Sequence, residues 1–385
     1  MTNLTLLLTL IPSLGADVQA PGTTPVERTQ IRCQAALDRL VAGPLPGASA
    51  ALILPDGELL QIVAGVVSED TGERLEPEHL LLVGSTGKTF VTAAAHKLIA
   101  EGKLDLDAPA ASYFDETPEW VEQLPNAAEV TILHLLRHQS GIPRYVFEEE
   151  FTRLMATQPE RVWKPEELLT FLFDARPLFA PGEGWAYSDT NYIVLGLVIE
   201  ELTGASFYDY VREHFVEPFD LKHTLSTDRM RLPRMAQGHV VMGRSMGVPS
   251  RTLVDGAFAY NVQFEWCGGG WASTPSDLAL WARILCSGEA VEGPYLETLL
   301  DAVPARDLGP GARYGLGVIL RDTVAGPAIG HDGFMPGYLT ALAWFPDHGI
   351  AGAMQLNSDD GRTVGRPLAM VLAELVEIAA EELGR

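Results

Sequence analysis

The sequence is poor in cysteine and in positive charge. Its 385 residues include three cysteines, Cys33, Cys267 and Cys286, which allow at most one disulfide bond and exclude a disulfide framework. The sequence does not decide whether Cys267 and Cys286 pair. Only 27 Lys and Arg residues stand against 51 Asp and Glu residues, so the formal net charge is -24. Such a surface repels phosphate backbones and anionic lipids, and nucleic acid is therefore excluded as an expected partner.

Long apolar runs are also missing. A membrane-spanning helix needs about 18 consecutive apolar residues or more, and we expect no stable membrane span. The first residues do contain a short apolar run, followed by the small-x-small sequence that closes at Ala20, which is typical of a secretory signal peptide. No Lys or Arg precedes Arg28, so the usual positive start is missing apart from the amino terminus. We expect a signal peptide over 1–20 and a periplasmic or secreted protein.

Spacings typical of metal sites are absent as well. There is no Cys-x-x-Cys pair, and His134 and His138, four residues apart, lack the Glu of a metalloprotease helix. We interpret these histidines as two polar positions near the end of an amphipathic helix. No metal and no cofactor is expected.

Apolar periodicity defines the expected elements. Helical spacing covers 26–41, and two apolar runs at 48–54 and 59–67 predict strands joined by a turn. A third run at 80–83 leads into a helix over 85–101. Further helices are predicted at 130–138, 165–173, 191–202, 207–215, 274–286 and 368–383, and further strands at 314–320, 338–345 and 350–356.

Predicted strands at both ends of the chain surround a helical middle. This order favours an α/β (α+β) fold in which an antiparallel sheet, flanked by helices, is built from both chain ends. We expect an α/β domain from 26–84 and 291–385. The region 85–290 is expected to be a mostly helical insertion that carries the helix over 85–101 at its start.

The segment 84–89 reads GSTGKT and allows two functional interpretations. In the first, Ser85 and Lys88 form a Ser-x-x-Lys pair on one helix face, where the amine can take the hydroxyl proton as the serine attacks. Chance alone predicts roughly 0.2 such pairs in this composition. In the second, Gly-Lys-Thr ends a phosphate-binding loop, but that loop requires Gly where this chain has Leu82. We favour the first interpretation.

Other stretches follow in a characteristic order. The segment 181–192 reads PGEGWAYSDTNY, and 330–338 reads GHDGFMPGY. Two further stretches, LHLLRHQSGIP at 133–143 and GGWASTPSDL at 269–278, accompany them. Over about 45–360 the chain resembles the serine β-lactamase and penicillin-binding protein superfamily, in its branch of class C β-lactamases, D,D-carboxypeptidases and family VIII esterases. The resemblance implies a β-lactamase/transpeptidase-like fold.

The resemblance also implies the roles of individual residues. Ser85 corresponds to the nucleophile, Lys88 to its activating amine, and Tyr187 to the group that carries the proton to the leaving group. His331 stands where the family places Lys or His on the strand that lines the site. The backbone N–H groups of Ser85 and Phe334 would form the oxyanion hole. The implied mechanism passes through an acyl-enzyme without metal or cofactor.

One departure from the family concerns the second motif. It usually reads Tyr-x-Asn, whereas this chain has Asp189 at the third position. A carboxylate near Lys88 stabilises the ammonium form and raises its pKa, so proton abstraction would fall more heavily on Tyr187. Asn191 could supply the missing amide only if the loop differs in register.

A second departure follows His331. Members that handle penicillins or D-Ala-D-Ala ends commonly have Thr where this chain has Asp332, and a second anion there repels a substrate carboxylate. After Gly333, Phe334 and Met335 add apolar bulk at the expected mouth of the site. We therefore expect uncharged esters or amides, or a substrate amine paired with Asp332, to be preferred over β-lactams.

The sequence thus predicts a serine hydrolase that acts through an acyl-enzyme on small-molecule or peptide-like esters and amides. One alternative is a D,D-carboxypeptidase or class C β-lactamase, in which a neighbouring Arg would neutralise Asp332. A second alternative is a catalytically degenerate homologue that binds peptidoglycan fragments or a protein partner. The natural substrate and the oligomeric state are not defined by the sequence.

Overall fold

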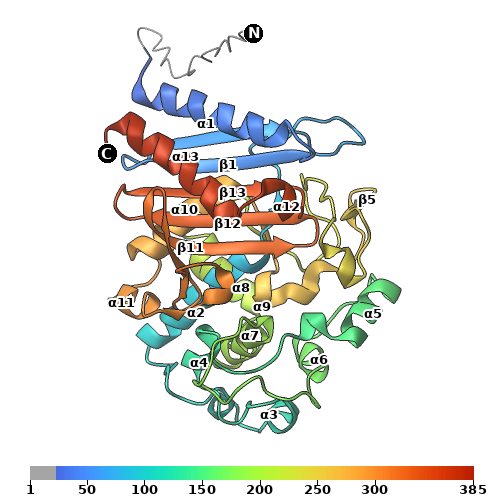
Figure 1. Cartoon of the computed structure of the whole chain (residues 1–385). Coiled ribbons are helices and arrows are strands. Elements are labelled where there is room, and N and C mark those ends of the chain that lie inside the picture. Colours follow the sequence, from blue (N-terminus) through green and yellow to red (C-terminus); the bar gives the residue numbers. More distant parts are fainter. Residues whose placement is uncertain (1–22) are drawn as a thin grey trace, which may run out of the picture.

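The computed structural model describes residues 23–385, and the signal peptide expected over 1–20 lies outside these residues. An antiparallel sheet of eight strands forms the frame, in the order β2-β1-β13-β12-β11-β10-β9-β8, so both chain ends contribute to it (Figure 1). Its strands are β1 (Gly47–Ile53), β2 (Leu59–Gly65), β8 (Val303–Pro304), β9 (Arg313–Tyr314), β10 (Ile319–Thr323), β11 (Gly326–Met335), β12 (Tyr338–Phe345) and β13 (Ile350–Leu356). The predicted fold class is confirmed.

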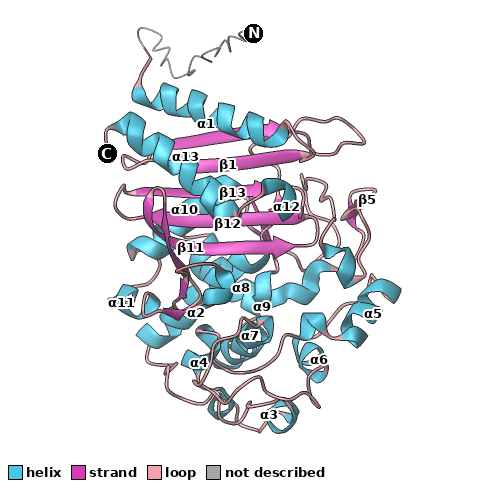
Figure 2. Cartoon of the chain, in the orientation of Figure 1, coloured by secondary structure: helices cyan, strands magenta, loops and turns pink. Residues whose placement is uncertain are grey.

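Helices cover both faces of this sheet. Helices α1 (Pro25–Val41) and α13 (Leu368–Leu383) pack side by side on one face, and α10 (Pro275–Ser287) packs against β1, β12 and β13 on the other (Figure 2). Strand β1 therefore has no solvent-facing side, and Ala50 and Leu52 join one apolar cluster while Ala51 and Ile53 join the other. This double burial explains why the sequence shows a continuous apolar run rather than an alternating one.

Local signals set the ends of these helices. Thr24 caps α1 in a capping box with Glu27, and Pro25 occupies the first turn. Thr274 caps α10 in the same way, with Pro275 next to it, and Gly288 ends the helix in the left-handed conformation. The expected start of this helix at 274 is thus confirmed.

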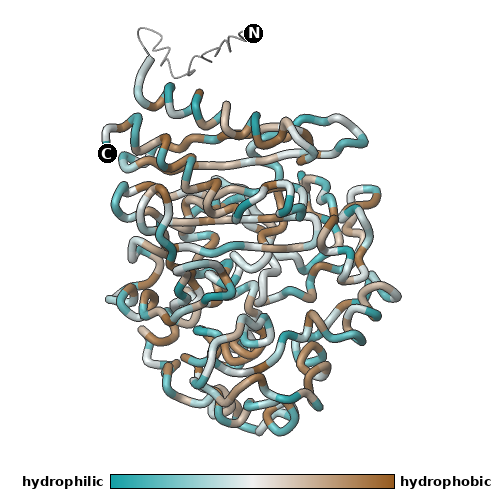
Figure 3. The backbone as a smooth tube through the Cα atoms, viewed as in Figure 1, coloured by the Kyte–Doolittle hydropathy of each residue, from teal (hydrophilic) through white to brown (hydrophobic). Residues whose placement is uncertain are grey.

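The helical part of the chain lies below the sheet in Figure 1 and is organised around two buried helices. Helices α2 (Lys88–Ala100) and α7 (Asp189–Thr203) pack together, and the turns of α7 are largely apolar in Figure 3. Shorter helices surround them: α3 (Glu119–Gln123), α4 (Ile132–Leu136), α5 (Glu149–Thr157), α6 (Pro165–Thr170), α8 (Phe207–Val211), α9 (Trp266–Gly269), α11 (Leu296–Leu299) and α12 (Gly361–Val364). Two small sheets complete the fold, formed by β3 (Leu81–Leu82), β7 (Trp271–Ser273) and β4 (Leu225–Ser226), and by β5 (Leu253–Val254) and β6 (Ala257–Phe258). No helix in the described part of the chain is long and apolar enough to cross a membrane.

Three expectations were wrong in detail. The run 314–320 is not one strand, because a turn around Gly317, with φ +75°, separates β9 from β10. The helix predicted to end at His138 ends at Leu136, since His138 takes a φ of 58°. The segment 326–335 forms the long strand β11 although its glycines hid any apolar alternation. Cys33, Cys267 and Cys286 are free and buried, so Cys267 and Cys286 do not pair.

A single buried carboxylate fastens a surface loop to the end of the sheet. Asp359 is fully buried and accepts hydrogen bonds from the backbone N–H groups of Val241, Met242, Gly243 and Gly337, at 2.6 to 3.0 Å. The loop that holds Met242 is thereby joined to the turn between β11 and β12. Four donors depend on one side chain.

We predict that Asp359→Asn lowers the free energy of unfolding by about 2–4 kcal/mol, because an amide nitrogen cannot accept these bonds and leaves buried donors unpaired. Asp360→Asn is the matched control, since Asp360 bonds only the hydroxyl of Thr363 and the backbone near it, and it should cost less than about 1 kcal/mol. Urea denaturation of both variants provides the measurement. Equal losses in the two variants would contradict the assignment.

Candidate active site

The centre of the site is a contact between a hydroxyl and an amine. Gly84–Gly87 forms a single 3-10 turn that runs directly into α2, and Lys88 Nζ donates to Ser85 Oγ at 3.1 Å. Gly84 has a φ of +53°, and a Cβ at this position would lie 2.5 Å from the carbonyl oxygen of Phe334. Only glycine permits this close approach of the turn to β11. The turn therefore presents Ser85 directly beside the edge of the sheet.

Lys88 is completely buried and donates to three acceptors. Besides Ser85 Oγ, its Nζ lies 2.7 Å from Asp189 Oδ1 and 2.5 Å from the carbonyl oxygen of Gly268. Burial acts to lower the pKa of Lys88, but the carboxylate of Asp189 outweighs it, so the pKa is raised above its usual value. Lys88 is therefore an ammonium ion at neutral pH, as the substitution of Asp for Asn suggested from the sequence.

Asp189 lies between two cations. Its second oxygen, Oδ2, accepts hydrogen bonds from Arg144 Nε at 2.9 Å and from Arg144 Nη2 at 2.6 Å. Burial acts to raise the pKa of Asp189, but Arg144 and Lys88 together lower it below its usual range. The carboxylate is thus permanently charged and holds both cations in place. Sequence reasoning missed Arg144, although it directly follows the stretch 133–143 that supported the resemblance.

Tyr187 faces this charge pair from the loop before α7. The Lys88 ammonium lies 5.1 Å and the Arg144 guanidinium carbon 5.3 Å from the centre of its ring. Burial raises the pKa of Tyr187, whereas Lys88, Ser85 and Arg144 act to lower it, so the resting group is a neutral phenol. Its hydroxyl lies near the Ser85 side chain but makes no hydrogen bond of normal geometry with any described residue. The phenol is free to exchange a proton with a reacting group.

His138 packs against Tyr187 and corrects a prediction. It is buried rather than a polar helix position, with its ring centre 4.2 Å from that of Tyr187. The N–H of Ser188 donates to His138 Nδ1 at 3.2 Å, and burial holds the pKa of His138 well below its usual value. His138 is therefore neutral and supports the tyrosine loop. His134 instead takes part in the cap of α4 through Thr131.

Asn191 does not replace the missing amide. It is buried on α7, where its Oδ1 accepts from Ser140 Oγ at 2.6 Å and its side chain contacts His138 Nδ1 at 3.2 Å. No hydrogen bond joins it to Lys88 in the described structure. Its function is to fix the stretch that holds Ser140 against the tyrosine loop.

His331 lies on β11, opposite Tyr187, with 6.2 Å between the ring centres. Its Nδ1 lies 2.6 Å from the backbone carbonyl oxygen of Asp332 and must donate to it, so Nε2 accepts from the hydroxyl of Tyr314 at 2.9 Å. Burial, together with the Lys88 ammonium, lowers the pKa of His331 to about 4. The imidazole is neutral. Tyr314 was not singled out from the sequence, because only the pairing of strands brings it to His331.

Asp332 is not a free anion. Arg321 of β10 binds it through two hydrogen bonds, Nη1 to Oδ1 at 2.9 Å and Nη2 to Oδ2 at 2.5 Å. A bidentate pair of this kind neutralises the carboxylate. The predicted repulsion of a substrate carboxylate by Asp332 therefore loses its basis, and so does the predicted pairing of Asp332 with a substrate amine.

A cavity of about 720 Å³ opens above Ser85. Tyr187, His331, Asp332 and Gly333 line it together with Ser85, whereas Lys88 lies buried beneath. Its apolar wall consists of Met242, Leu308, Ile319, Phe334, Leu339 and Leu368. Phe334 is 38% exposed, as expected for the mouth, but Met335 is 2% exposed, belongs to the core and does not line the cavity.

Two backbone segments meet beside the nucleophile. A Cβ on Gly84 would lie within 2.5 to 2.8 Å of the backbone O, C and N of Phe334, and one on Gly333 would lie 2.0 Å from the carbonyl oxygen of Val83. The backbones at Ser85 and Phe334 therefore run in contact, as an oxyanion hole shared between them requires. Within the described residues, no group of three or more His, Cys, Asp or Glu side chains could hold a metal ion.

Comparison with known proteins agrees with this geometry. The family model described as Beta-lactamase matches residues 33–377. Esterase EstB of Burkholderia gladioli is 29% identical over 85% of this chain and 89% of its own length, and penicillin-binding protein 4 of Amycolatopsis lactamdurans is 26% identical over 81% of each. The solved structure of D-amino acid amidase from Ochrobactrum anthropi SV3 superimposes with a TM-score of 0.76 at 26% identity, covering 92% of this chain and 98% of that one.

We predict that the neutral state of His331 makes folding sensitive to acid. Its pKa is about 4 in the folded chain and about 6.5 in the unfolded chain, so the unfolded state binds the extra proton between these values. Stability present above pH 6.5 is therefore lost as the pH falls. Between pH 7 and pH 4.5, wild type should lose about 2–3 kcal/mol more of its unfolding free energy than His331→Gln.

Urea titrations at both pH values test this, with His223→Gln as the control because His223 is half-exposed on the surface. The control should lose as much as wild type. A loss in His331→Gln as large as in wild type would show that His331 is not held neutral.

Proposed function

We propose, since the chain belongs to the beta-lactamase family and is a serine hydrolase, that Ser85 attacks the carbonyl carbon of an ester or amide and forms a covalent acyl intermediate. The observation that carries this proposal is the 3.1 Å contact between Lys88 Nζ and Ser85 Oγ at the floor of the cavity. Tyr187 and His331 line the same cavity from opposite sides.

The proton of Ser85 passes to Tyr187 in this proposal. Lys88 is already an ammonium ion and cannot accept it, whereas two cations beside the Tyr187 ring stabilise the minor phenolate form. The phenolate takes the Ser85 proton as Oγ bonds to the carbonyl carbon. The carbonyl oxygen becomes an oxyanion, which the N–H groups of Ser85 and Phe334 stabilise.

Collapse of this intermediate breaks the bond to the leaving group. Tyr187, now protonated, donates its proton to the departing alcohol or amine, and the acyl group remains on Ser85. A water molecule then gives its proton to Tyr187 and attacks the ester, which releases the acid and restores the serine. Neutral His331 holds the Tyr314 hydroxyl beside this path and adds no charge.

The charges of the cavity favour substrates without a carboxylate. Arg144 pairs with Asp189, Arg321 with Asp332, and Arg366 with Glu374 at 2.7 Å. Each of these cations is thus already neutralised, and the wall is otherwise apolar. The sequence-based preference for uncharged esters and amides is retained on this different ground.

A penicillin-recognising activity is the second candidate. The bidentate pair between Arg321 and Asp332 supports it, because the anion that argued against a carboxylate-bearing substrate is neutralised. The relatives in the family comparison include both esterase and penicillin-binding proteins. We further propose export to the periplasm or the medium, on the basis of the leader sequence at 1–20.

We predict that a fluorophosphonate adds one covalent group to the wild-type chain and none to Ser85→Ala, because only Ser85 combines exposure in the cavity with an adjacent ammonium ion. Ser276→Ala is the control, since Ser276 lies at the start of α10, far along the chain from the site, and should label like wild type. Intact-mass spectrometry provides the measurement. Labelling of Ser85→Ala, or no label on wild type, would contradict the proposal and favour a degenerate binding protein.

We also predict that kcat/KM for short p-nitrophenyl esters exceeds that for nitrocefin by more than about tenfold, a difference of about 1.4 kcal/mol. The reason is that no unpaired cation lines the cavity to bind the carboxylate of a β-lactam. Amides of D-amino acids and D-Ala-D-Ala peptides complete the panel. Similar values for nitrocefin and the esters would instead support the second candidate.

A further inference from the structure

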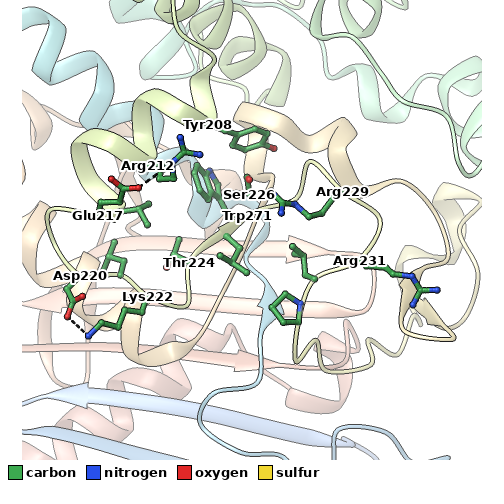
Figure 4. A pocket seen from close by; sticks show the side chains of 15 residues that line it. Tyr208, Arg212, Glu217, Asp220, Lys222, Thr224, Ser226, Arg229, Arg231 and Trp271 are labelled. Carbon is green, nitrogen blue, oxygen red and sulfur yellow. Dashed lines mark ion pairs between the residues drawn. The ribbon is translucent and has the colours of Figure 1, made fainter.

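A second cavity, of about 450 Å³, lies apart from the Ser85 cavity and shares no lining residue with it. Figure 4 shows its walls, which come from α8 and the helical turn after it, the loop 217–233 and the first residue of β7. Cavities of this size are typical of sites for small organic molecules. The mechanism proposed above does not use this cavity.

Two aromatic rings and several aliphatic side chains form its interior. The rings of Tyr208 and Trp271 meet edge to face, with 5.1 Å between their centres and 85° between their planes. Leu221, Leu225 and Leu232 also line the cavity. This lining suits a flat apolar group, such as an aromatic ring.

The rim of the cavity is positively charged in an otherwise acidic protein. Arg212, Lys222, Arg229 and Arg231 line it against two carboxylates, those of Glu217 and Asp220, while the whole chain carries a net charge of -24. Ion pairs join Arg212 to Glu217 and Lys222 to Asp220 (Figure 4). The excess positive charge favours an anionic ligand.

Arg231 is the least committed of these cations. Its Nη1 donates at 2.6 Å to the backbone carbonyl oxygen of Asp255, and it makes no ion pair with any residue that the structure describes. A ligand carboxylate would supply the missing negative partner.

Polar atoms in the interior also lack partners. Trp271 is 2% exposed, and its Nε1, which can only donate, has no hydrogen-bond acceptor in the described structure. The buried hydroxyl of Tyr208 also makes no hydrogen bond of normal geometry. Buried donors without partners are rare in folded proteins, and a bound oxygen atom would satisfy them.

We propose that this cavity binds a small aromatic carboxylate. Its ring lies among Tyr208, Trp271 and the leucines, and its carboxylate lies at Arg231 and the neighbouring arginines. The ligand would contact the chain close to Ser85, since a Cβ on Gly87 would lie 3.0 Å from Trp271 Cδ1, and the N–H of Val83 donates to the Trp271 carbonyl oxygen at 3.0 Å. The proposal stands independently of the hydrolytic function.

Isothermal titration of the full chain with 2-naphthoate tests the charge and the ring together, with 2-naphthamide as the uncharged probe. We expect naphthoate to bind and naphthamide to bind at least about fivefold more weakly. Arg231→Gln and Arg212→Gln should each weaken naphthoate binding about three- to fivefold. Trp271→Phe, which keeps a ring but loses the N–H, should also weaken it, and a thermal melt of each variant shows that it is folded.

Arg153→Gln is the matched control for Arg212. Both arginines are 56% exposed in their side chains and each pairs with an acid three residues away on a helix. The control should bind naphthoate like wild type. No binding of naphthoate, or equal affinity for naphthamide, would overturn the proposal.

Arg366→Gln separates the two cavities, because Arg366 lines the Ser85 cavity. We expect it to leave naphthoate binding unchanged. Weaker binding in Arg366→Gln together with unchanged binding in Arg212→Gln and Arg231→Gln would place the ligand above Ser85 and overturn the proposal.

Discussion

The buried charge group of Lys88, Asp189 and Arg144 is the constraint on which the site depends. One carboxylate accepts from both cations, so it holds an ammonium ion against Ser85 and a guanidinium group beside Tyr187. Buried charges are stable only when they are paired and hydrogen-bonded, and the loss of one partner would leave the others uncompensated. The three residues come from α2, the start of α7 and the segment before Tyr145. Their pairing therefore ties chemistry to the packing of the helical part on the sheet.

Much of this arrangement could be predicted from the sequence because it is encoded locally. Ser85 and Lys88 lie three residues apart on one helical segment, and the apolar runs of β1, β12 and β13 are continuous because both faces of the sheet are buried. The expected effect of Asp189 on Lys88 also follows from charge alone. Tyr187 and His331 were placed by resemblance to a family, and the structure brings both to the same cavity.

What could not be predicted depends on contacts between distant segments. Arg144 reaches Asp189 across 45 residues, and Tyr314 reaches His331 across 17. The pairing of β10 with β11 brings Arg321 to Asp332, which reverses the charge that the sequence suggested at this position. Met335 was assigned to the mouth, yet strand alternation turns it into the core next to the exposed Phe334. Each of these outcomes depends on a register that no local pattern defines.

The central claim is that Asp189 keeps Lys88 protonated, so that Tyr187 and not Lys88 handles the proton. Nuclear magnetic resonance of chain labelled at lysine Cε and Nζ tests it directly, because the sequence contains only five lysines and Lys88→Arg identifies the signal. Lys88 should keep its ammonium chemical shift up to about pH 10, near the usual lysine pKa of about 10.4 or beyond it. A Lys88 signal that titrates near about pH 8 in wild type would contradict the account, since a neutral amine would then be available to activate Ser85.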